Sequence, residues 1–309
     1  MKQDKLSSAA PWAYLSLRRV RHFSGTLMQA TQQQPTFSNH PGLPESWATE
    51  WGKDRFGAFA RLHVGGVWQT FRWIMPGTFL MGSPDSEYAR NADETLHAVT
   101  LTQGFWLADT PVTQALWGAV MGNNPSRFNG AERPVENVGW DDAHAFIHQA
   151  NRLQPGLALC LPTEAQWEYA CRAGTTTPFA FGNSLSTTTA NYHGDYPYQS
   201  IRPRLGKYRR KTTVVLEFPP NAWGLYGMHG NVWEWCQDWF GSYETKRGWQ
   251  PLANPQGPAS GPYRVLRGGS WCSCAADCRS ACRDPVFPDF GVGDFGFRLA
   301  CCPGQQAEP

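Results

Sequence analysis

The sequence predicts an α+β domain rich in irregular loops. Hydrophobic residues fill 41% of the 309 positions, which is enough to enclose one sizeable core. The chain also carries 31 glycines and 24 prolines, and aromatic residues reach 14% with 15 tryptophans. This composition favours short elements joined by long ordered loops over a helical bundle or a parallel α/β sheet.

The expected domain spans residues 47–302 and is flanked by two tails. Residues 1–46 contain the segments 31–35 and 41–44, which are polar, rich in turn formers and without hydrophobic periodicity. Such segments lack the apolar surface that would order them, so we expect an N-terminal tail or linker there. Residues 303–309 are expected to form a C-terminal tail.

Strand-type residues occur in two parts of this domain. From Phe56 to Leu80 they are interrupted by Gly65-Gly66 and Pro76-Gly77, which predicts a hairpin followed by another strand. Residues 265–267 and 297–299 are expected to form two strands of one sheet, on either side of a long excursion.

Three helices are expected between these parts. The first begins at Thr110-Pro111 and ends at Gly122; the second is capped by Asp141. The third begins at Thr163, which forms a capping box with Gln166. Four apolar residues share one face of the second helix: Ala143, Phe146, Ile147 and Ala150.

Charge and hydropathy argue against several classes of partner. The formal net charge of +2 supplies no field that would favour nucleic acid or an anionic membrane. No segment approaches the roughly 18 apolar residues of a membrane span, and the first thirty positions lack an apolar stretch of signal-peptide length. We therefore expect a cytoplasmic protein.

The nine cysteines predict neither a disulfide framework nor a zinc site. Their number is odd, and six of them lie after position 270. Cys272 and Cys274 are separated by one residue, Cys301 and Cys302 are adjacent, and no histidine follows His229. Tetrahedral zinc sites usually take paired ligands at wider spacing, so structural zinc is not expected.

Seven short motifs follow one another across roughly residues 70 to 300. They are PGTFLMGS at 76–83, PVT at 111–113, PVENV at 134–138, LPTEAQWEYA at 161–170, GNVWEW at 230–235, RGGSW at 267–271 and GFR at 296–298. In this order they resemble the formylglycine-generating-enzyme superfamily, the sulfatase-modifying factors. The resemblance implies an elaborated C-type lectin fold. That superfamily includes an oxidase that converts a sulfatase cysteine to formylglycine and members that only bind ligands, so the fold does not select the function.

The resemblance also locates the thiols that an oxidase would need. The oxidase binds copper with two thiols, five residues apart, after Gly-Gly-Ser, because Cu(I) prefers thiolate ligands. Counted from Gly268-Gly269-Ser270, these positions fall on Ser273 and Cys278. Cys272 and Cys274 flank the missing thiol, but in an extended segment a shift of one residue turns the side chain to the opposite face. We therefore expect no catalysis; the alternative is a copper-dependent formylglycine-generating oxidase acting on a sulfatase cysteine.

The stretch from Cys272 to Phe295 has an unusual composition. It shows neither strand alternation nor helical periodicity, and it lacks Lys, Glu, Gln, Met and Trp, all of which occur elsewhere in the chain. Codons ending in C or T cannot encode these five types. The stretch and its flanking residues resemble the variable proteins of diversity-generating retroelements, in which adenines of template codons are randomised during copying.

This resemblance divides the stretch into two sets of positions. Framework residues are Arg279, Ser280, Ala281, Arg283 and Cys278, whereas Pro285, Phe287 and Gly291 remain open. The diversified, ligand-binding positions are Cys272, Ser273, Cys274, Ala276, Asp277, Cys282, Asp284, Val286, Phe290, Val292, Gly293, Asp294 and Phe295. An ordinary loop packed by buried cysteines and phenylalanines is the alternative.

A diversified surface needs side chains that face outward from a rigid scaffold. Phe290 and Phe295 are expected as apolar anchors, and Asp277, Asp284 and Asp294 as hydrogen-bond acceptors, for a ligand that we expect to be a protein. Exposed thiols in this surface would be chemically vulnerable. The expected supporting side chains are Trp233, Trp235, Trp271, Arg279, Arg283, Phe297 and Arg298.

No cofactor is required by these assignments, although the resemblance suggests calcium. Hard oxygen ligands would come from two groups of residues. They are Gly230, Val232 and Glu234 in one group, and Asn191, the carbonyl of Tyr192 and Asp195 in the other. The alternative for Glu234 is an ion pair with an arginine in the core. His144 and His148, four apart on a helix, are expected on a solvated face without a metal.

Overall fold

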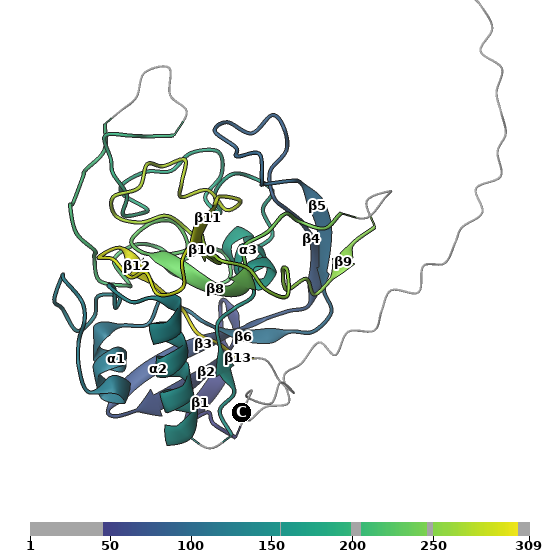
Figure 1. Cartoon of the computed structure of the whole chain (residues 1–309). Coiled ribbons are helices and arrows are strands. Elements are labelled where there is room, and N and C mark those ends of the chain that lie inside the picture. The colour runs from purple at the N-terminus through teal and green to yellow at the C-terminus, as the bar shows by residue number, and fades with distance from the viewer. Residues whose placement is uncertain (1–45, 155, 199–204, 246–249, 302–309) are drawn as a thin grey trace, which may run out of the picture. The chain divides into compact units, whose positions relative to one another are not determined.

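The structure is a computed structural model that describes residues 46–154, 156–198, 205–245 and 250–301. The expected tails, apart from Ser46, lie outside these ranges. The described part contains three β-sheets and three α-helices joined by long loops (Figure 1). The expected α+β class with abundant irregular structure is therefore confirmed.

The largest sheet contains the expected hairpin. Gly65 and Gly66 connect its strands with φ angles of 56° and 81°, which glycine adopts without steric cost. The two hairpin strands pair antiparallel from Phe59↔Arg72 to Val64↔Val67. The six strands, in spatial order, are β1 (Glu50–Asp54), β2 (Gly57–Val64), β3 (Val67–Ile74), β6 (Phe105–Ala108), β13 (Ala300–Cys301) and β7 (Leu159–Cys160).

Two smaller sheets complete the strand content of the described residues. The four-stranded sheet has the order β11 (Arg283–Val286), β10 (Arg264–Arg267), β8 (Trp233–Trp239) and β12 (Phe295–Gly296). The three-stranded sheet has the order β4 (Gly77–Met81), β5 (His97–Leu101) and β9 (Leu252–Ala253).

The helices are α1 (Gln114–Met121), α2 (Trp140–Leu153) and α3 (Glu164–Arg172). The capping box of Thr163 and Gln166 is confirmed, as is the end of α1 at Gly122. The expected start of α1 was wrong: Thr113 caps it by accepting a hydrogen bond from the Leu116 N–H. The segment before Thr113 does not become helical, because the Val112 N–H donates to the Phe297 carbonyl instead.

Helix α2 also begins differently from the expectation. Its N-cap is Gly139, whose N–H donates to the Asp142 carboxylate at 2.9 Å, so Asp141 lies in the first turn and is not the cap. The apolar face of the helix is confirmed, because the four residues predicted for it are all buried. Helices α1 and α2 pack against each other; α1 contacts β2 and β3, and α2 contacts β7, so together they lie along the six-stranded sheet (Figure 1).

Residues 297–299 do not form the expected strand. They connect β12 in the four-stranded sheet to β13 in the six-stranded sheet. Their carbonyls still accept backbone hydrogen bonds, from Val112 to Phe297 at 2.9 Å and from Ala108 to Leu299 at 2.8 Å. The segment therefore joins two sheets, and Phe297 is fully buried in the main core between them.

None of the helices among the described residues has the length and apolar character needed to cross a membrane.

Candidate ligand-binding surface

The segment from Cys272 to Phe295 is tied to the four-stranded sheet at two places. The chain leaves β10 at Arg267 and reaches Cys272 five residues later; the segment then passes through β11, which pairs antiparallel with β10, and ends in β12, which pairs parallel with β8. Between these strands the segment consists of turns and bends. Both places are therefore anchored by backbone hydrogen bonds, while the residues between them lie outside regular structure.

Most of the proposed diversified positions are accessible to solvent. Eleven of the thirteen are exposed or partly exposed: Cys272, Ser273, Cys274, Ala276, Asp277, Asp284, Val286, Phe290, Val292, Gly293 and Asp294. Phe290 is 50% exposed, and Phe287, whose assignment the sequence left open, is 54% exposed. Exposed aromatic side chains of this size are the type that dominates binding at protein interfaces.

Two of the proposed binding residues are buried, so the expectation that they face outward was wrong. Cys282 is 4% exposed and Phe295 is 7% exposed, and both belong to the main hydrophobic core. Phe295 lies in β12, where its ring contacts Trp235 edge-on at 5.7 Å. It also contacts the Phe290 ring at 6.0 Å and so supports that exposed side chain.

The framework arginine Arg279 binds a distant part of the chain. Its guanidinium donates to both carboxylate oxygens of Glu94 at 2.7 Å, to Glu87 at 2.7 Å and to the Ala89 carbonyl at 2.7 Å. Burial would raise the pKa of Glu94, but the hydrogen bonds and charge of Arg279 outweigh it and lower that pKa. Arg279 therefore holds the middle of residues 272–295, which we call the variable stretch after the proteins it resembles, to residues 87–94.

Three other buried arginines make similar pairs. Arg283 donates to the two Glu164 oxygens at 2.7 and 2.6 Å, and Arg298 donates to the two Glu234 oxygens at 2.5 and 2.7 Å. Arg267, the first residue of the RGGSW motif, binds Glu168 and the carbonyls of residues 280 and 282, although it was not among the expected supporting side chains. We call Arg267, Arg279, Arg283 and Arg298, with their glutamate partners Glu87, Glu94, Glu164, Glu168 and Glu234, the arginine–glutamate framework.

The expected supporting role is confirmed by burial for six of seven side chains. Trp233, Trp235, Phe297 and the three predicted arginines are buried. Trp271 is only partly buried. Its indole N–H donates to the Gly293 carbonyl at 2.9 Å, so it braces the edge of the variable stretch and does not lie in the core.

Two thiols of the stretch lie beside carboxylates, which disfavour their thiolate forms. Cys272 Sγ lies 3.2 Å from Asp294 Oδ2, and Cys274 Sγ lies 3.2 Å from Asp277 Oδ2. Burial raises the pKa of Cys272 to about 11, and the negative charge of Asp294 contributes in the same direction. Because the thiolate is the reactive form, both thiols are disfavoured as nucleophiles and as metal ligands.

The positions that would carry copper in an oxidase are likewise unsuited to it. Ser273 Oγ hydrogen-bonds to the Ser270 N–H at 3.1 Å. Cys278 is fully buried, and burial raises its pKa well above the ordinary thiol value. Among the described residues, no group of three or more His, Cys, Asp or Glu side chains is placed to hold a metal ion.

The Glu234 carboxylate is already occupied, so it does not fit the calcium-binding role suggested for it. Both oxygens of Glu234 already accept hydrogen bonds from Arg298, and Oε2 also accepts one from the Trp167 indole at 2.6 Å. The ion-pair alternative for Glu234 is therefore the correct one. In the second group Asn191 is fully buried, whereas the Asp195 side chain is 55% exposed. The Gly230 carbonyl accepts the Val232 N–H at 3.1 Å, and the Asn231 N–H donates to the Asn191 carbonyl at 2.8 Å.

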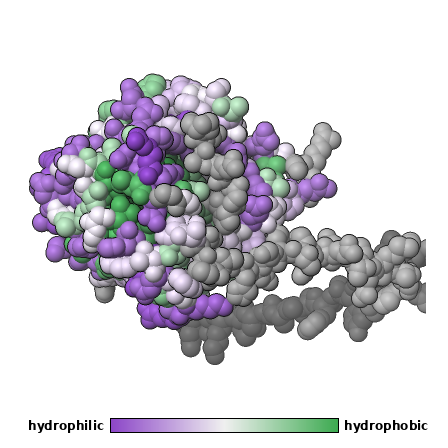
Figure 2. Space-filling view, turned by 90° about the horizontal axis from the view of Figure 1, so that it is seen from below, coloured by the Kyte–Doolittle hydropathy of each residue, from purple (hydrophilic) through white to green (hydrophobic). Residues whose placement is uncertain are grey.

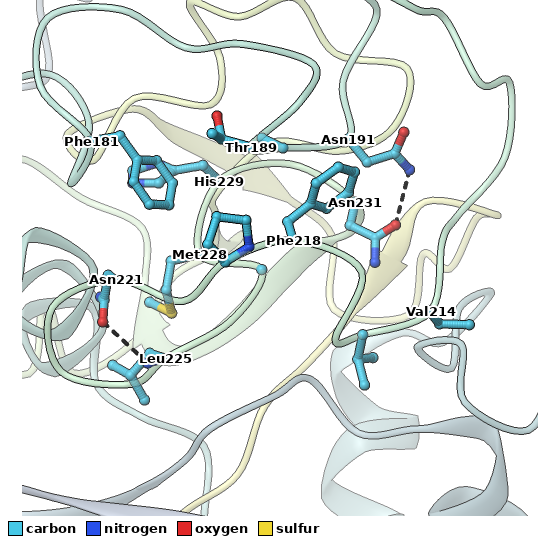
Figure 3. A pocket seen from close by; sticks show the side chains of 14 residues that line it. Phe181, Thr189, Asn191, Val214, Phe218, Asn221, Leu225, Met228, His229 and Asn231 are labelled. Atoms are coloured by element: carbon cyan, nitrogen blue, oxygen red, sulfur yellow. Dashed lines mark hydrogen bonds between the residues drawn. The ribbon is translucent and has the colours of Figure 1, made fainter. Parts of the chain in front are cut away.

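A small cavity lies beside His229 (Figure 3). Asn191, Asn231, Met228 and His229 are among the side chains around it, and the Asn191 amide points toward Asn231. The space measures about 10 Å³, which is room for one water molecule at most. A ligand of any larger size must therefore bind elsewhere.

His229 connects this cavity to the variable stretch. Its Nδ1 lies 2.8 Å from the Cys278 carbonyl, and its Nε2 accepts the Ala180 N–H at 3.0 Å. A neutral ring with the proton on Nδ1 satisfies both bonds. Burial lowers the pKa of His229 to about 4.

A larger groove runs along α2 and β7, away from the variable stretch. Its lining includes Gln103, Asn151 and Gln237, with none of the proposed diversified positions. Figure 2 shows an apolar hollow among hydrophilic residues on the face that is seen from below. His144 in this groove stacks on Trp140 at 3.6 Å and lies 3.1 Å from the Gln237 side chain, so the α2 histidines have no metal-binding arrangement.

Comparison with known proteins places the chain in a family. The sulfatase-modifying factor enzyme 1-like domain matches residues 66–302. The chain belongs to this family. It is 34% identical to the formylglycine-generating enzyme of Mus musculus over 214 residues, which cover 66% of this chain and 53% of that protein. It is also 34% identical to the formylglycine-generating enzyme of Streptomyces coelicolor over 197 residues. The chain thus spans about half the length of the curated relatives that it matches.

Among solved structures, the Treponema denticola variable protein 1 is similar over 79% of this chain and 99% of its own length. The sequence identity is 31% and the TM-score is 0.66. PvdO from Pseudomonas aeruginosa, at 23% identity and a TM-score of 0.59, shows the shared fold alone. The expected sulfatase-modifying factor fold and the likeness to a variable protein are confirmed.

Some residues beside the variable stretch escaped the sequence analysis. His193, Tyr208 and Phe128 come from three separate loops. Tyr208 and Phe128 both contact the Trp271 ring, and His193 stacks on Tyr208. The signal in the sequence was the cluster of four basic residues around Tyr208 at 207–211, in a part of the chain that was expected to be mostly loop. Only the fold reveals that this loop lies beside Trp271.

Proposed function

We propose that this protein is a non-catalytic ligand-binding protein whose surface between Cys272 and Phe295 is diversified by retroelement mutagenic homing. The ligand is a protein, and neither nucleic acid nor a membrane is a partner. Calcium has no part in this proposal.

The main support is the separation of framework and accessible positions within one short stretch. The framework residues Arg279 and Arg283 are 1% and 4% exposed and bind glutamates elsewhere in the chain. Eleven of the thirteen proposed diversified positions are at least partly accessible. A scaffold that must tolerate many sequences needs this separation, because exposed substitutions usually change stability by less than about 0.5 kcal/mol.

The competing function is the oxidase activity of the formylglycine-generating enzymes to which the chain is related. The thiol chemistry argues against it, because one of the two required positions is Ser273 and the other, Cys278, is fully buried. Purified protein given Cu(I) and a peptide with the sulfatase Cys-x-Pro-x-Arg motif is expected to yield no formylglycine by mass spectrometry. Turnover of that peptide would establish the oxidase instead.

A genomic observation tests the diversification. We expect a near-copy of the DNA that encodes residues 271–295, differing at adenines, beside a reverse-transcriptase gene. A complete genome without such a repeat would remove the basis for this part of the proposal.

A binding experiment tests the surface itself. Peptides are selected from a random displayed library on the wild-type protein, and their affinity is then measured for a variant carrying Phe287→Ser and Phe290→Ser. We expect the affinity to fall by about tenfold or more, because exposed aromatic anchors carry much of the binding free energy. The control carries Trp51→Ser and Trp68→Ser, two tryptophans that are 47% and 50% exposed on β1 and β3. Equal losses in both variants would contradict the proposal.

A further inference from the structure

Five aromatic side chains form a continuous row along one edge of the variable stretch. The His193 ring stacks on Tyr208 at 3.6 Å and 14° and contacts Tyr196 at 4.6 Å. Tyr208 lies nearly parallel to Trp271 at 6.2 Å, and Phe128 meets Trp271 edge-on at 5.3 Å. We call these five residues the aromatic row. None of them belongs to the proposed diversified set.

Hydrogen bonds join the aromatic row to the variable stretch. The His193 N–H donates to the Ser273 carbonyl at 2.9 Å, and the Tyr196 carbonyl accepts the Ala275 N–H at 3.0 Å. The Trp271 indole donates to the Gly293 carbonyl at 2.9 Å. A ligand that covers positions 272–273 and 293–294 therefore also meets this row.

Exposed cations accompany the row. Lys207, Arg210 and Lys211 are exposed and make no ion pair with any described residue. The Arg210 guanidinium lies 5.4 Å from the centre of the Tyr208 ring, and the Arg127 guanidinium lies 5.1 Å from that of Phe128. Arg210 also holds a φ of 58°, which is uncommon for a residue with a side chain.

The basic segment is held in place by the loops around it. The Lys207 N–H donates to Thr187 Oγ1 at 3.0 Å, and the Asn191 side chain donates to the Lys211 carbonyl at 2.9 Å. Between them the Arg209 guanidinium donates to the Thr187 carbonyl at 2.9 Å. A fixed backbone lowers the entropy lost when the exposed cations bind a partner.

We propose that the aromatic row, with Lys207, Arg210 and Lys211, forms a constant half of the binding surface that receives a short acidic segment of the protein ligand. The proposal rests on the proposed function, in which the diversified positions form the other half. The constant half provides attraction common to all ligands, and the variable half selects among them. Cations beside aromatic faces bind carboxylates while the rings cover the apolar parts of the segment.

The charges of the variable half favour a short acidic segment over a long polyanion. Asp277, Asp284, Asp289 and Asp294 make no ion pair with a described residue. A nucleic acid lying across both halves would be repelled by these carboxylates. A protein can place its acidic groups against the basic segment and other side chains against the aspartates.

Fluorescence anisotropy tests the proposal with a labelled tetraglutamate peptide, a tetralysine peptide and a short oligothymidylate as probes. At low salt, tetraglutamate is expected to bind the wild type more tightly than either other probe. The variant with Arg210→Glu and Lys211→Glu is expected to bind tetraglutamate at least about tenfold more weakly. The matched control, Lys53→Glu with Arg55→Glu, has the same charge change at exposed positions around the end of β1 and is expected to retain binding.

Three results would overturn the proposal. They are no binding of tetraglutamate to the wild type, equal losses in the two charge-reversed variants, and tighter binding of oligothymidylate than of tetraglutamate.

The Phe287→Ser, Phe290→Ser variant separates this proposal from the proposed function. If library-selected peptides lose affinity for that variant while tetraglutamate never binds, the constant half is wrong and the variable surface stands. If tetraglutamate binds as expected and the selected peptides bind the variant as tightly as the wild type, the variable surface is wrong and the basic binding site stands.

Discussion

Arg283 and Asp284 are neighbours in strand β11, yet they have opposite surroundings. Arg283 is 4% exposed and both oxygens of Glu164 lie within hydrogen-bond distance of it. The Asp284 side chain is partly exposed and has no cation partner among the described residues. The contrast between the two residues shows that a buried, paired charge and an accessible, unpaired charge can be adjacent in one strand. A charged side chain of this stretch is buried where the rest of the domain supplies an opposite charge, as Glu164 does for Arg283.

The largest expected effect concerns the framework. Arg279→Ala removes one partner of a buried pair and leaves Glu94 without compensation, which typically costs about 3–5 kcal/mol. We expect the variant to unfold at much lower denaturant concentration or to be insoluble. Arg127→Ala, at an exposed arginine, is the control and should stay within about 0.5 kcal/mol of the wild type. Equal stability of the two variants would contradict the structural role of Arg279.

The Arg279 pair can be probed further with a double variant. Arg279→Met combined with Glu94→Leu replaces both charges by apolar groups, and it is expected to recover part of the stability lost in Arg279→Ala. No recovery would indicate that the hydrogen bonds to Glu87 and the Ala89 carbonyl contribute more than the pair with Glu94.

Acid is expected to destabilise the protein at His229, because a proton on Nε2 removes the acceptor for the Ala180 N–H. The pKa of His229 is about 4 in the folded protein, below the ordinary value of 6.5, because the ring is buried. The unfolded chain therefore takes up the proton first, and stability is lost as pH falls from about 6.5 to about 4, by about 3 kcal/mol. Chemical denaturation at both pH values, compared with His229→Gln, measures this contribution. A pH dependence that is the same in both proteins would contradict it.

A comparison of two variants distinguishes the accessible Phe290 from the buried Phe295. Phe290→Ala is expected to change the free energy of unfolding by under about 1 kcal/mol, whereas Phe295→Ala should cost about 3–5 kcal/mol. Phe290 is 50% exposed and Phe295 is 7% exposed. Thermal melts of the two variants compare them directly. The same loss in both would mean that Phe290 also belongs to the core.

The smallest expected effect is a gain in stability. Glu136 is buried; its Oε1 accepts the Phe128 N–H at 2.7 Å, while its Oε2 has no hydrogen-bond partner among the described residues. A side chain at Gly293 would begin 3.4 Å from Oε2. Gly293→Ser could therefore donate to Glu136 and raise the melting temperature by a few degrees, equivalent to about 1 kcal/mol.

A double-variant cycle identifies the source of that gain. With Glu136→Ala in the background, Gly293→Ser is expected to lose most of its benefit, because the carboxylate that would accept the serine hydroxyl is gone. An unchanged gain would assign the effect to the lost flexibility of glycine.

Local patterns predicted the parts of the fold that depend on near neighbours in the chain. The Gly65-Gly66 turn and the Thr163 capping box need only a few consecutive residues, and both were correct. Thr110 failed as a cap because the following Val112 is held by Phe297, nearly 200 positions away. No local pattern contains that contact.

The same limit applies to the candidate site. The absence of five residue types and the framework residues drew attention to residues 272–295, but Cys282 and Phe295 were wrongly assigned to the surface of this stretch. Their burial depends on β12 and β10 lying in the same sheet, which composition does not encode. Likewise, the aromatic row joins residues from four separate segments, and sequence spacing could not bring them together.

The long reach of Arg279 has a consequence for how the chain folds. Its partners Glu87 and Glu94 lie 192 and 185 positions earlier, so they leave the ribosome well before the variable stretch is made. Contacts of such long sequence separation form late, because the loop they close must first lose its entropy. Residues 46–154 can thus begin to order while the codons of the variable stretch are still untranslated. We expect variants with substitutions in residues 272–295 to share this early phase of folding and to differ from the wild type only in the last step of folding.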